Sequence, residues 1–448
     1  MIPKEYRWRY IFHMTDIRNL ESIIKYGLLS AHRMEALDIK HENISNLVIQ
    51  ERREKVTVPC GPGGSLHDYV PFYFTSMNPM LLSVINKKNY DQPFILFLCL
   101  KIQKLENKKG IFSEASINTN SVPKIYDNCS ELTKLDWDLI DSRKWHYNDE
   151  DRHRKMAEAL IKDEVKISDI DAIVVYNENI KKCVESIFKR NKLSCPRICF
   201  SFGLDDRKSY CFFYTKFFLK DPKVKNNTLV TGPVFLLHEY KALLKNIKEM
   251  RMNRKKYLFP SLDCFIKSAD DNFNCIPELK GIYGLKTENP IHKETVSEHT
   301  INVVKNIRSH YNLFSDKDKR ILVAAAYLHD IGKGPKDKWK DGKQLNYPDH
   351  PADAIPMLEK ILTEDIDNLT DDDIRKICML VVYHDLVGDC ICKERDINQI
   401  INVAHSENDL DLLITISLAD TQSINSTWYT EIYYSKENFR KKLIGSLK

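Results

Sequence analysis

The feature that most constrains this chain is a change of hydrophobic pattern near Asp221–Thr231 (DPKVKNNTLVT), a polar segment without periodicity. Before this segment, short apolar and aromatic runs typical of strands alternate with helical spacing. From Phe235 onward, helical spacing continues to the end and no alternating strand pattern returns. A chain of 448 residues is also too long for one ordinary core. The sequence therefore predicts an α+β protein in which a mixed α/β domain precedes an all-α domain.

The polar segment also sets the predicted boundaries, with a first domain over 1–220, a linker and helical connector over 221–290, and a last domain over 291–448. Asn19–Leu29 is predicted to be an amphipathic helix closed by Gly27, and Pro59–Gly64 must be a loop because its prolines and glycines cannot continue a regular element. Strands are expected at Val70–Phe74, Phe94–Leu100, Ala172–Tyr176 and Tyr210–Tyr214.

Composition and charge favour a soluble, cytoplasmic protein that does not cross a membrane. The start of the chain has no apolar core of a secretory signal, and the longest apolar run, Pro93–Leu100, is too short to span a bilayer. The twelve cysteines lack a secreted-scaffold spacing and are expected to be reduced. Basic stretches at Lys216–Asn227 and Lys245–Tyr257 could contact phosphates or form solvated helix faces.

Three groups of polar residues lie in apolar surroundings of the first domain. In chain order they are His13 with Thr15, Arg52 with Arg53, and Glu158 within RKMAEALI. A carboxylate in such surroundings needs a partner, a proton or a function, because burying it unpaired is costly. Taken singly, each residue also has a structural explanation, as a core histidine, a helix-surface charge or the solvent side of an amphipathic segment.

Together these segments resemble the DarT family of DNA ADP-ribosyltransferase toxins, over roughly Tyr6–Tyr214. The shared features are H-x-T-x-(I/V)-x-N-L followed by GLLS, then IQ-x-R-R, then LHDYVPFYF-x-x-x-x-PML, and last (A/S)-E-x-L-(I/V) with a following V-x-x-x-x-I. The opening motif is carried here by His13, Thr15, Asn19, Leu20 and Gly27–Ser30, and the last by Ala157–Ile161 and Val165–Ile170. The resemblance implies an ADP-ribosyltransferase-like fold for the first domain.

The resemblance also implies an activity, in which NAD is consumed as a substrate and a base of single-stranded DNA, of the thymidine type, is modified. Glu158 would stabilise the positive charge that develops at the ribose carbon and would take a proton from the base. Arg53, or else the adjacent Arg52, would hold the diphosphate and help the base lose its proton. The residues implied to bind NAD or complete its pocket are His13, Thr15, Asn19, Leu20, Tyr69 and Tyr73.

One position departs from the family pattern. The family has an arginine shortly before Pro-Met, as in RSPM, whereas this chain reads Met77-Asn78-Pro79-Met80. A cation lost there would weaken contacts with DNA or NAD, or would shift the acceptor.

The second domain carries histidines and aspartates on successive predicted helices. His329 and Asp330 lie near the end of a buried helix in VAAAYLHDIGKG, where adjacent polar side chains need the compensation that a bound cation supplies. Similar settings hold His299, His350, His384 and Asp420. Imidazoles and carboxylates without thiolate suit Mn, Fe, Co or Zn, and Mg is the remaining divalent candidate.

The ordered set H…HD…H…H…D resembles the HD phosphohydrolase superfamily, and over about Ile276–Leu443 it looks most like the HD domain of the PII uridylyltransferase/uridylyl-removing enzymes. The segments TVSEHT, HDIGKG and LADTQSINSTW carry this likeness. By the resemblance, one cation would be bound by His299, His329, Asp330 and Asp420, and a second site would be completed by His350 and His384. Lys333 would steady a phosphate as a point charge.

The leading hypothesis is an NAD-dependent DNA ADP-ribosyltransferase fused to a metal-dependent phosphohydrolase, a toxin whose partners are DNA, NAD and an antitoxin protein. In the alternative, the HD domain hydrolyses a nucleotide or phosphodiester as the main activity, and the first domain only recognises the substrate. A third hypothesis is a nucleic-acid-binding module with two inactive sites. A fourth links the halves, with the HD site cutting the diphosphate of attached ADP-ribose.

Overall fold

The computed structural model describes residues 1–45, 47–107, 110–118, 122–142, 148–200, 228–252, 256–289, 293–309, 314–339, 341–345 and 347–447. The chain divides into two compact units. The sheet unit comprises Met1–Asn86 and Tyr90–Tyr214, and the helical unit comprises Lys87–Asn89 and Thr215–Lys448. The boundaries expected at residues 220 and 290 stay predictions.

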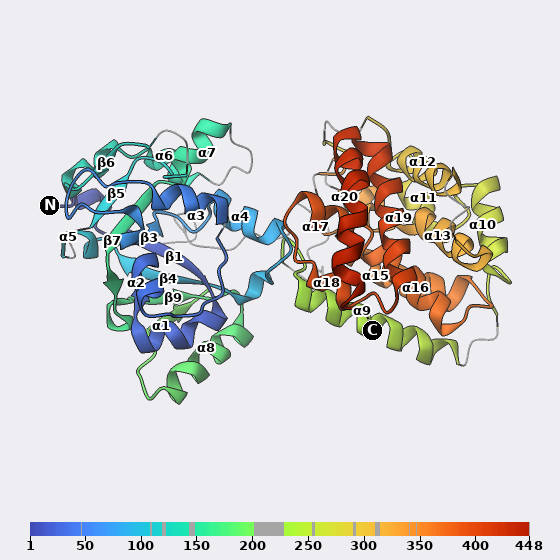
Figure 1. The fold of residues 1–448 in the computed structure, drawn as a ribbon, viewed down its shortest axis with the longest axis horizontal. Helices are drawn as coiled ribbons and strands as arrows, with labels where there is room; N and C mark the ends of the chain where they lie inside the picture. Colours follow the sequence, from blue (N-terminus) through green and yellow to red (C-terminus); the bar gives the residue numbers. More distant parts are fainter. Residues whose placement is uncertain are drawn as a thin grey trace. The chain divides into compact units, whose positions relative to one another are not determined.

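The sheet unit is built on a mixed eight-stranded sheet with the order β10-β9-β4-β1-β3-β7-β5-β6, and β2 pairs with β8 in a separate ribbon (Figure 1). The strands are β1 (Tyr10–Asp16), β2 (Leu28–Leu29), β3 (Tyr69–Tyr73), β4 (Ile95–Lys101), β5 (Ile111–Ser113), β6 (Ile125–Tyr126), β7 (Glu158–Lys162), β8 (Glu164–Val165), β9 (Ala172–Val174) and β10 (Arg197–Cys199).

Strand register decides which residues meet near the centre of this sheet. β1 pairs with β4 along its whole length, but it pairs with β3 only at Phe12 and Tyr73. On its other side, Tyr73 lies opposite Glu158, the first residue of β7. Tyr73 therefore stands between β1 and the candidate carboxylate, at one end of the β3–β7 ladder.

Helices α1 and α8 cover one face of the sheet, because Leu20, Ile24 and Phe188 pack in the same core as Phe72 and Leu98. The α-helices of the sheet unit are α1 (Leu20–Tyr26), α2 (Ala31–Ala36), α3 (Leu47–Glu54), α4 (Pro79–Asn86), α5 (Lys104–Asn107), α6 (Trp137–Asp141), α7 (Asp149–Lys155) and α8 (Glu178–Arg190). Its short 3-10 helices are η1 (Lys4–Tyr6), η2 (Ile17–Asn19), η3 (Leu66–Asp68), η4 (Gln92–Phe94), η5 (Cys129–Lys134) and η6 (Ile167–Asp169).

The elements predicted from local pattern can be compared with these bounds. The predicted helix ends one turn earlier than expected, at Tyr26, because Gly27 adopts a φ of 85° and the chain then enters β2. The strands predicted from residues 70, 94 and 172 correspond to β3, β4 and β9. The strand predicted at Tyr210–Tyr214 and the basic stretch Lys216–Asn227 lie outside the described residues.

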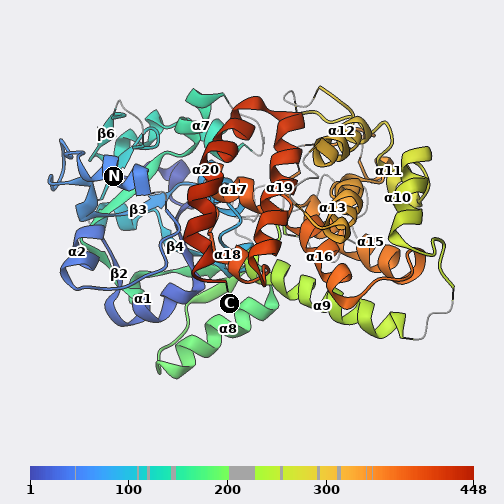
Figure 2. The same ribbon diagram turned by 45° about the vertical axis from the view of Figure 1, so that its right-hand side comes forward.

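In the helical unit, α12, α13, α16 and α19 pack against one another, and α20 packs on α19 (Figures 1 and 2). Side-chain caps begin several of these helices, such as the capping box of Thr370 and Asp373 at α16. The α-helices are α9 (Pro233–Arg251), α10 (Leu262–Asp271), α11 (Pro277–Ile282), α12 (Val296–Ser309), α13 (Asp316–Leu328), α14 (His350–Asp353), α15 (Ile355–Lys360), α16 (Asp371–Val382), α17 (Leu386–Cys392), α18 (Asn398–Ile401), α19 (Glu407–Ile424) and α20 (Ser426–Ile444).

Three shorter helical turns complete this unit, η8 (Ile331–Lys333), η9 (Lys336–Lys338) and the π-turn η10 (Ile361–Asp365). One large hydrophobic core runs through it, from Leu236 to Leu443. The predicted fold class, a mixed sheet-and-helix domain followed by a helical domain, is confirmed. Within the described residues, every helix is too short or too polar to cross a membrane.

Candidate functional site

The carboxylate of Glu158 is almost completely buried, with 1% of the residue exposed. Its Oε1 atom accepts hydrogen bonds from the Ile117 backbone N–H at 2.8 Å and from Arg53 Nη1 at 3.0 Å, and a longer one from Ser116 Oγ at 3.4 Å. Its Oε2 atom lies 2.9 Å from the same guanidinium but accepts no hydrogen bond of good geometry within the described residues. One oxygen is therefore anchored and the other retains its hydrogen-bonding capacity.

Arg53 comes from the last turn of α3, where a cation is favoured by the helix dipole. Only 7% of the residue is exposed, and its Nη1 atom also donates to the Ile117 carbonyl at 3.5 Å. The adjacent Arg52 is exposed. The structure therefore brings Arg53 to Glu158 and leaves Arg52 on the surface, although the sequence could not separate the two.

The opening motif is distributed over β1 and the start of α1. His13 Nδ1 lies 2.8 Å from the Pro71 carbonyl, to which it must donate, and its ring packs edge-on against Phe72. Burial lowers the pKa of His13, so its ring is neutral at neutral pH and Nε2 carries a lone pair. Pro71 is two residues from Tyr73, and so His13 reaches β3 roughly 7 Å along the strand from the partner of Glu158.

Thr15, Asn19 and Leu20 have different surroundings. Asn19 Nδ2 donates to Thr15 Oγ1 at 3.1 Å and to the Glu42 carbonyl at 3.0 Å, and Asn19 Oδ1 accepts from the Glu42 N–H at 2.7 Å. Asn19 thus ties the 42 segment to β1. The Leu20 side chain is fully buried in the core of the sheet unit, so its backbone alone could face a ligand.

The two tyrosines lie at opposite ends of β3. Tyr73 is opposite Glu158 and donates its hydroxyl to Met80 Sδ at 2.9 Å; burial and the nearby Glu158 charge raise its pKa. Tyr69 is opposite Lys162 and donates to the Gly63 carbonyl at 2.9 Å, within the glycine–proline loop. The structure places Tyr73 beside the Arg53–Glu158 pair and Tyr69 four residues away along the strand.

The segment that departs from the family pattern has a structural role in this chain. Asn78 is fully buried, donates to the Thr75 carbonyl at 3.1 Å, and accepts from the Leu81 N–H at 3.1 Å at the start of α4. The asparagine therefore caps this helix in place of offering a cation.

Sequence reasoning missed the turn that holds Glu158. Ser113 Oγ accepts from the Glu158 backbone N–H at 3.3 Å and donates to the Ala115 carbonyl at 2.7 Å. This hydroxyl fixes the turn that presents Ser116 and Ile117 to the carboxylate. No periodicity marks the turn, and the small polar residues of SEASIN were its only signal.

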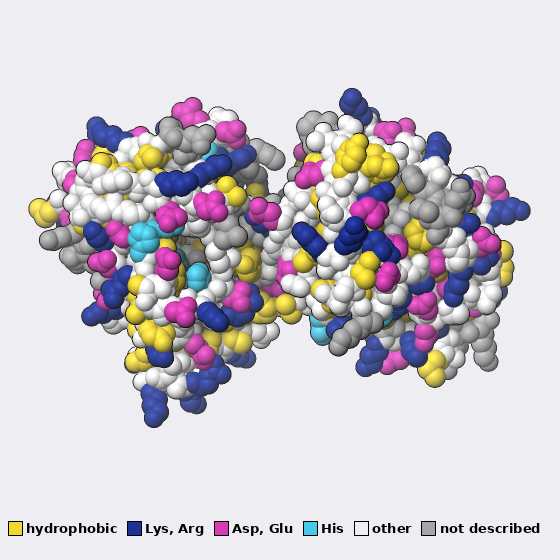
Figure 3. Space-filling model, viewed as in Figure 1, with side chains coloured by type: hydrophobic (Ala, Val, Ile, Leu, Met, Phe, Trp, Pro, Cys, Tyr) yellow, Lys and Arg dark blue, Asp and Glu magenta, His cyan; other side chains and the backbone are white. Residues whose placement is uncertain are grey.

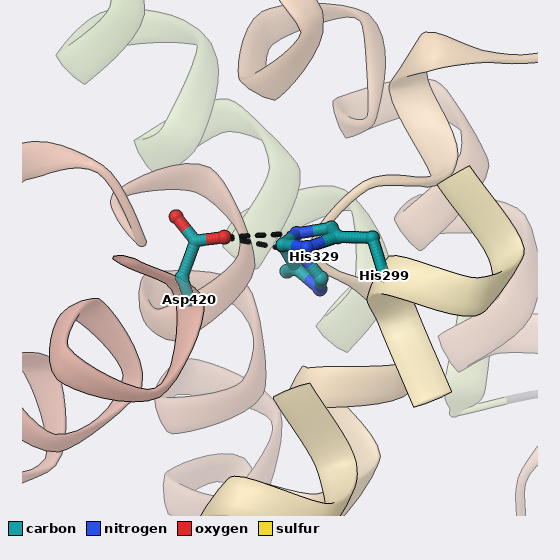
Figure 4. A group of neighbouring side chains, drawn as sticks. All are labelled: His299, His329 and Asp420. Atoms are coloured by element: carbon teal, nitrogen blue, oxygen red, sulfur yellow. Dashed lines mark hydrogen bonds and ion pairs between the residues drawn. The ribbon is translucent and has the colours of Figure 1, made fainter. Parts of the chain in front are cut away.

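In the helical unit the six predicted metal ligands come together. They form two groups whose candidate ligand atoms lie within 4.8 Å of one another, the first with His299, His329 and Asp420 (Figure 4) and the second with Asp330, His350 and His384. Asp330 also reaches the first group, because its Oδ2 lies 3.4 Å from His329 Nε2 while its Oδ1 lies 3.2 Å from His350 Nε2. One carboxylate thus lies between the two groups.

Hydrogen bonds fix the tautomer of all four histidines. The Nδ1 atoms of His329, His350 and His384 lie at 2.8, 3.2 and 2.8 Å from backbone carbonyls, to which they must donate. His299 Nδ1 lies 3.0 Å from Ser423 Oγ, which itself donates to the Asp420 carbonyl. Each Nε2 therefore points a lone pair into the cluster, the arrangement required of metal-binding imidazoles.

The contacts between these nitrogens fit a divalent cation. His299 Nε2 lies 3.2 Å from His329 Nε2, and His350 Nε2 lies 3.2 Å from His384 Nε2. Two lone pairs at this distance need a cation or proton between them. Burial lowers the pKa of His384 to about 4, which favours the neutral ligand form at neutral pH.

Lys333 is directed at the shared carboxylate. Its Nζ donates to Asp330 Oδ2 at 2.6 Å. Although burial opposes ionisation of Asp330, the Lys333 and His329 charges hold its pKa well below the ordinary value. Lys333 is thus at the cluster, as predicted from its position in HDIGKG, but already paired.

Comparisons with known proteins match both halves of the chain. Residues 12–201 match the family described as "ssDNA thymidine ADP-ribosyltransferase, DarT", and residues 296–420 match the HD domain. A DNA ADP-ribosyl transferase of Thermus sp. (strain 2.9) is 33% identical over 202 residues, which are 42% of this chain and 92% of that protein.

Two further similarities were found. The solved structure of Thermus sp. 2.9 DarT in complex with ADP-ribosylated ssDNA has 31% identity and a TM-score of 0.41, and the match covers 44% of this chain and 96% of that one. A bifunctional uridylyltransferase/uridylyl-removing enzyme of Cereibacter sphaeroides is 26% identical over 173 residues, 34% of this chain and 17% of that protein. The predicted resemblances of the two halves are confirmed.

Proposed function

Because this chain belongs to the DarT family, we propose that its sheet unit transfers ADP-ribose from NAD to a thymidine base in single-stranded DNA. In this reaction the bond between nicotinamide and the ribose carbon breaks, nicotinamide leaves, and a bond forms between that carbon and the base. The proton displaced from the base passes to the enzyme. The chain thus acts as an NAD-dependent DNA ADP-ribosyltransferase, with a metal-dependent hydrolase in the same polypeptide.

The observation that carries this proposal is the buried pair of Arg53 and Glu158, with one carboxylate oxygen still able to accept a hydrogen bond. Positive charge develops at the ribose carbon as nicotinamide leaves, and a fixed carboxylate in a low-dielectric site stabilises it. Because Ile117 and Ser116 hold Oε1, Oε2 is the oxygen that faces the reaction and takes the proton.

Arg53 has a complementary role in the proposal. Its guanidinium neutralises Glu158 in the absence of substrate, and it can also hold the diphosphate of NAD. We assign NAD contacts to His13 through its Nε2 lone pair, and to Thr15 and Asn19 through their polar atoms. Tyr73 is assigned to the wall of the pocket beside Glu158, while Leu20 and Tyr69 are assigned supporting roles outside it.

The test is transfer of label from NAD to single-stranded oligonucleotides. The wild-type protein is expected to label an oligonucleotide that contains thymidine, and the Glu158→Ala variant is not. A matched oligonucleotide in which every thymidine is replaced serves as the control. If the wild-type protein labels no nucleic acid of any sequence, the proposal is wrong.

For the helical unit we propose a second activity, hydrolysis of a phosphate ester with two divalent cations. The observation that favours it is the convergence of four Nε2 lone pairs on the Asp330 carboxylate. When bound, the cations would supply an activated water and neutralise the phosphoryl oxygens. His299, His329 and Asp420 would hold one cation, His350 and His384 the other, Asp330 would bridge them, and Lys333 would release Asp330 to contact the phosphate.

This second activity has its own test. Wild-type protein loaded with Mn is expected to hydrolyse p-nitrophenyl phosphate or bis(p-nitrophenyl) phosphate, and to retain that activity in the Glu158→Ala variant. Asp330→Ala should abolish it, whereas the exposed Asp337→Ala should not. Equal rates for the two aspartate variants would contradict the assignment.

Finer aspects of the function are proposals drawn from the family resemblance. We propose that the protein is a cytoplasmic toxin and that an antitoxin protein restrains it. Expression in bacteria should then slow growth for the wild type but not for Glu158→Ala. Equal growth of the two strains would contradict a toxin role.

A further inference from the structure

Several buried polar atoms near the Arg53–Glu158 pair have no hydrogen-bond partner within the described residues. They are His67 Nε2, Asn118 Oδ1, His153 Nδ1 and Glu158 Oε2. Leaving such an atom buried and unpaired costs about 1–3 kcal/mol, and native proteins keep few of them. A group of them around one ion pair indicates hydrogen bonds that a bound substrate completes.

Asn118 is placed at this site by its neighbour Ile117. The Ile117 N–H donates to Glu158 Oε1 at 2.8 Å, and the Ile117 carbonyl accepts from Arg53 Nη1 at 3.5 Å. Ile117 therefore contacts both members of the ion pair through its backbone. The next side chain along the turn is that of Asn118, whose Oδ1 is buried and unpaired.

His67 reaches the same site from η3. Its ring hydrogen-bonds with the backbone of Gln50, which lies one turn before Arg53 on α3. Since Nε2 has no partner, Nδ1 makes this bond and Nε2 carries the lone pair. Burial first, and then the Arg53 charge, lower the pKa of His67, so the ring is neutral at neutral pH.

The neighbouring His32 differs from His67 in its contacts. The two rings lie 5.6 Å apart, but His32 Nδ1 is paired with Asp68 Oδ1 at 2.8 Å and its side chain is 40% exposed. Figure 3 shows histidine side chains at the surface of the sheet unit on the face it views. His32 thus offers a matched control, because it is an adjacent histidine whose hydrogen bond is already made.

We propose that His67 and Asn118 are substrate-binding residues that accept hydrogen bonds from a planar amide or imide N–H group. This inference rests on the proposed function and identifies residues that no motif assigned. Two substrates of the proposed reaction present such a group, the carboxamide of nicotinamide in NAD and the imide N–H of thymine. An unpaired acceptor satisfied only by its proper substrate also confers selectivity. His153 is left out, because no contact fixes its tautomer.

The test uses the full-length protein and separates the two sources of the N–H group. His67→Phe and Asn118→Leu remove the acceptors while keeping similar volume, and His32→Phe is the control. Each variant is assayed for label transfer, with the KM for NAD and the KM for a thymidine oligonucleotide measured separately. Losing one neutral hydrogen bond should raise one of these KM values roughly three- to tenfold, with kcat less affected.

The pattern of the result identifies the ligand. A rise confined to the KM for NAD assigns the acceptor to the carboxamide, and a rise confined to the KM for the oligonucleotide assigns it to the base. Both KM values unchanged, or a loss in kcat alone, would overturn the inference, as would an equal effect of His32→Phe. Thermal unfolding checks folding, and His67→Leu and Asn118→Ala replace any variant that fails. An inactive wild type would instead contradict the proposed function itself.

Discussion

At the scale of single residues, Lys155 shows how far an environment can depart from its sequence context. It ends the charged run DRHRK, yet it is 1% exposed and its Nζ donates to the carbonyls of Leu139, Ile140 and Ser142 at 3.2, 3.0 and 2.7 Å. Burial lowers its pKa to about 8 from an ordinary 10.5. Between these two pH values the unfolded chain binds more protons than the folded one, so stability must rise with pH.

We therefore predict a difference in pH dependence between the wild type and Lys155→Met. Below pH 8 both states of the wild type are protonated at this site and the pH has no effect through it. From about pH 8 to 10.5, the wild-type free energy of unfolding should gain up to about 1.4 kcal/mol per pH unit relative to the variant. Urea unfolding at several pH values measures this difference. Parallel curves over the whole range would contradict the assignment.

At the scale of elements, local pattern predicted strands and helices well where one face is buried, as for β3 and β4. It could not predict that the 113–117 turn anchors Glu158, since that contact joins residues about forty positions apart. Nor could it predict that α3 buries Arg53 and exposes Arg52, because adjacent residues on a helix differ in environment only once the packing is known.

Gly332 provides a prediction at this scale. It lies in η8, and a Cβ atom added there would stand 1.9 Å from the His350 carbonyl and 2.7 Å from the Ala354 nitrogen. The glycine therefore lets the turn with Asp330 approach the helix with His350. Gly332→Ala should separate the two metal groups and lower the bound metal per chain, measured by elemental analysis after dialysis. Gly445→Ala, with open space around its Cβ, is the control and should bind metal as the wild type does.

At the scale of the whole molecule, the change in periodicity near residue 221 was enough to predict a sheet-containing part followed by a helical one. The six metal ligands could also be predicted as a set, because each is a polar residue in an apolar helical context and their order is distinctive. The bridging position of Asp330 could not, since it depends on how three helical segments meet.

Each unit has its own hydrophobic core, and so we predict two thermal transitions. A chelator should lower the transition of the helical unit alone, because bound cations stabilise only the fold that holds them. NAD should raise the transition of the sheet unit alone, by the same linkage. Differential scanning calorimetry with each addition measures both effects. A single transition that responds to both ligands would contradict this independence.

The central claim is that Arg53 and Glu158, rather than the exposed Arg52, act together on the bond between nicotinamide and ribose. The most direct measurement is the single-turnover rate of transfer from NAD to a thymidine oligonucleotide by Arg53→Ala and Arg52→Ala, with folding checked by thermal unfolding. We predict a loss of at least about 100-fold for folded Arg53→Ala and less than about threefold for Arg52→Ala, because a guanidinium that neutralises developing charge contributes about 3 kcal/mol or more. Equal rates for the two variants, or the greater loss in Arg52→Ala, would contradict the account.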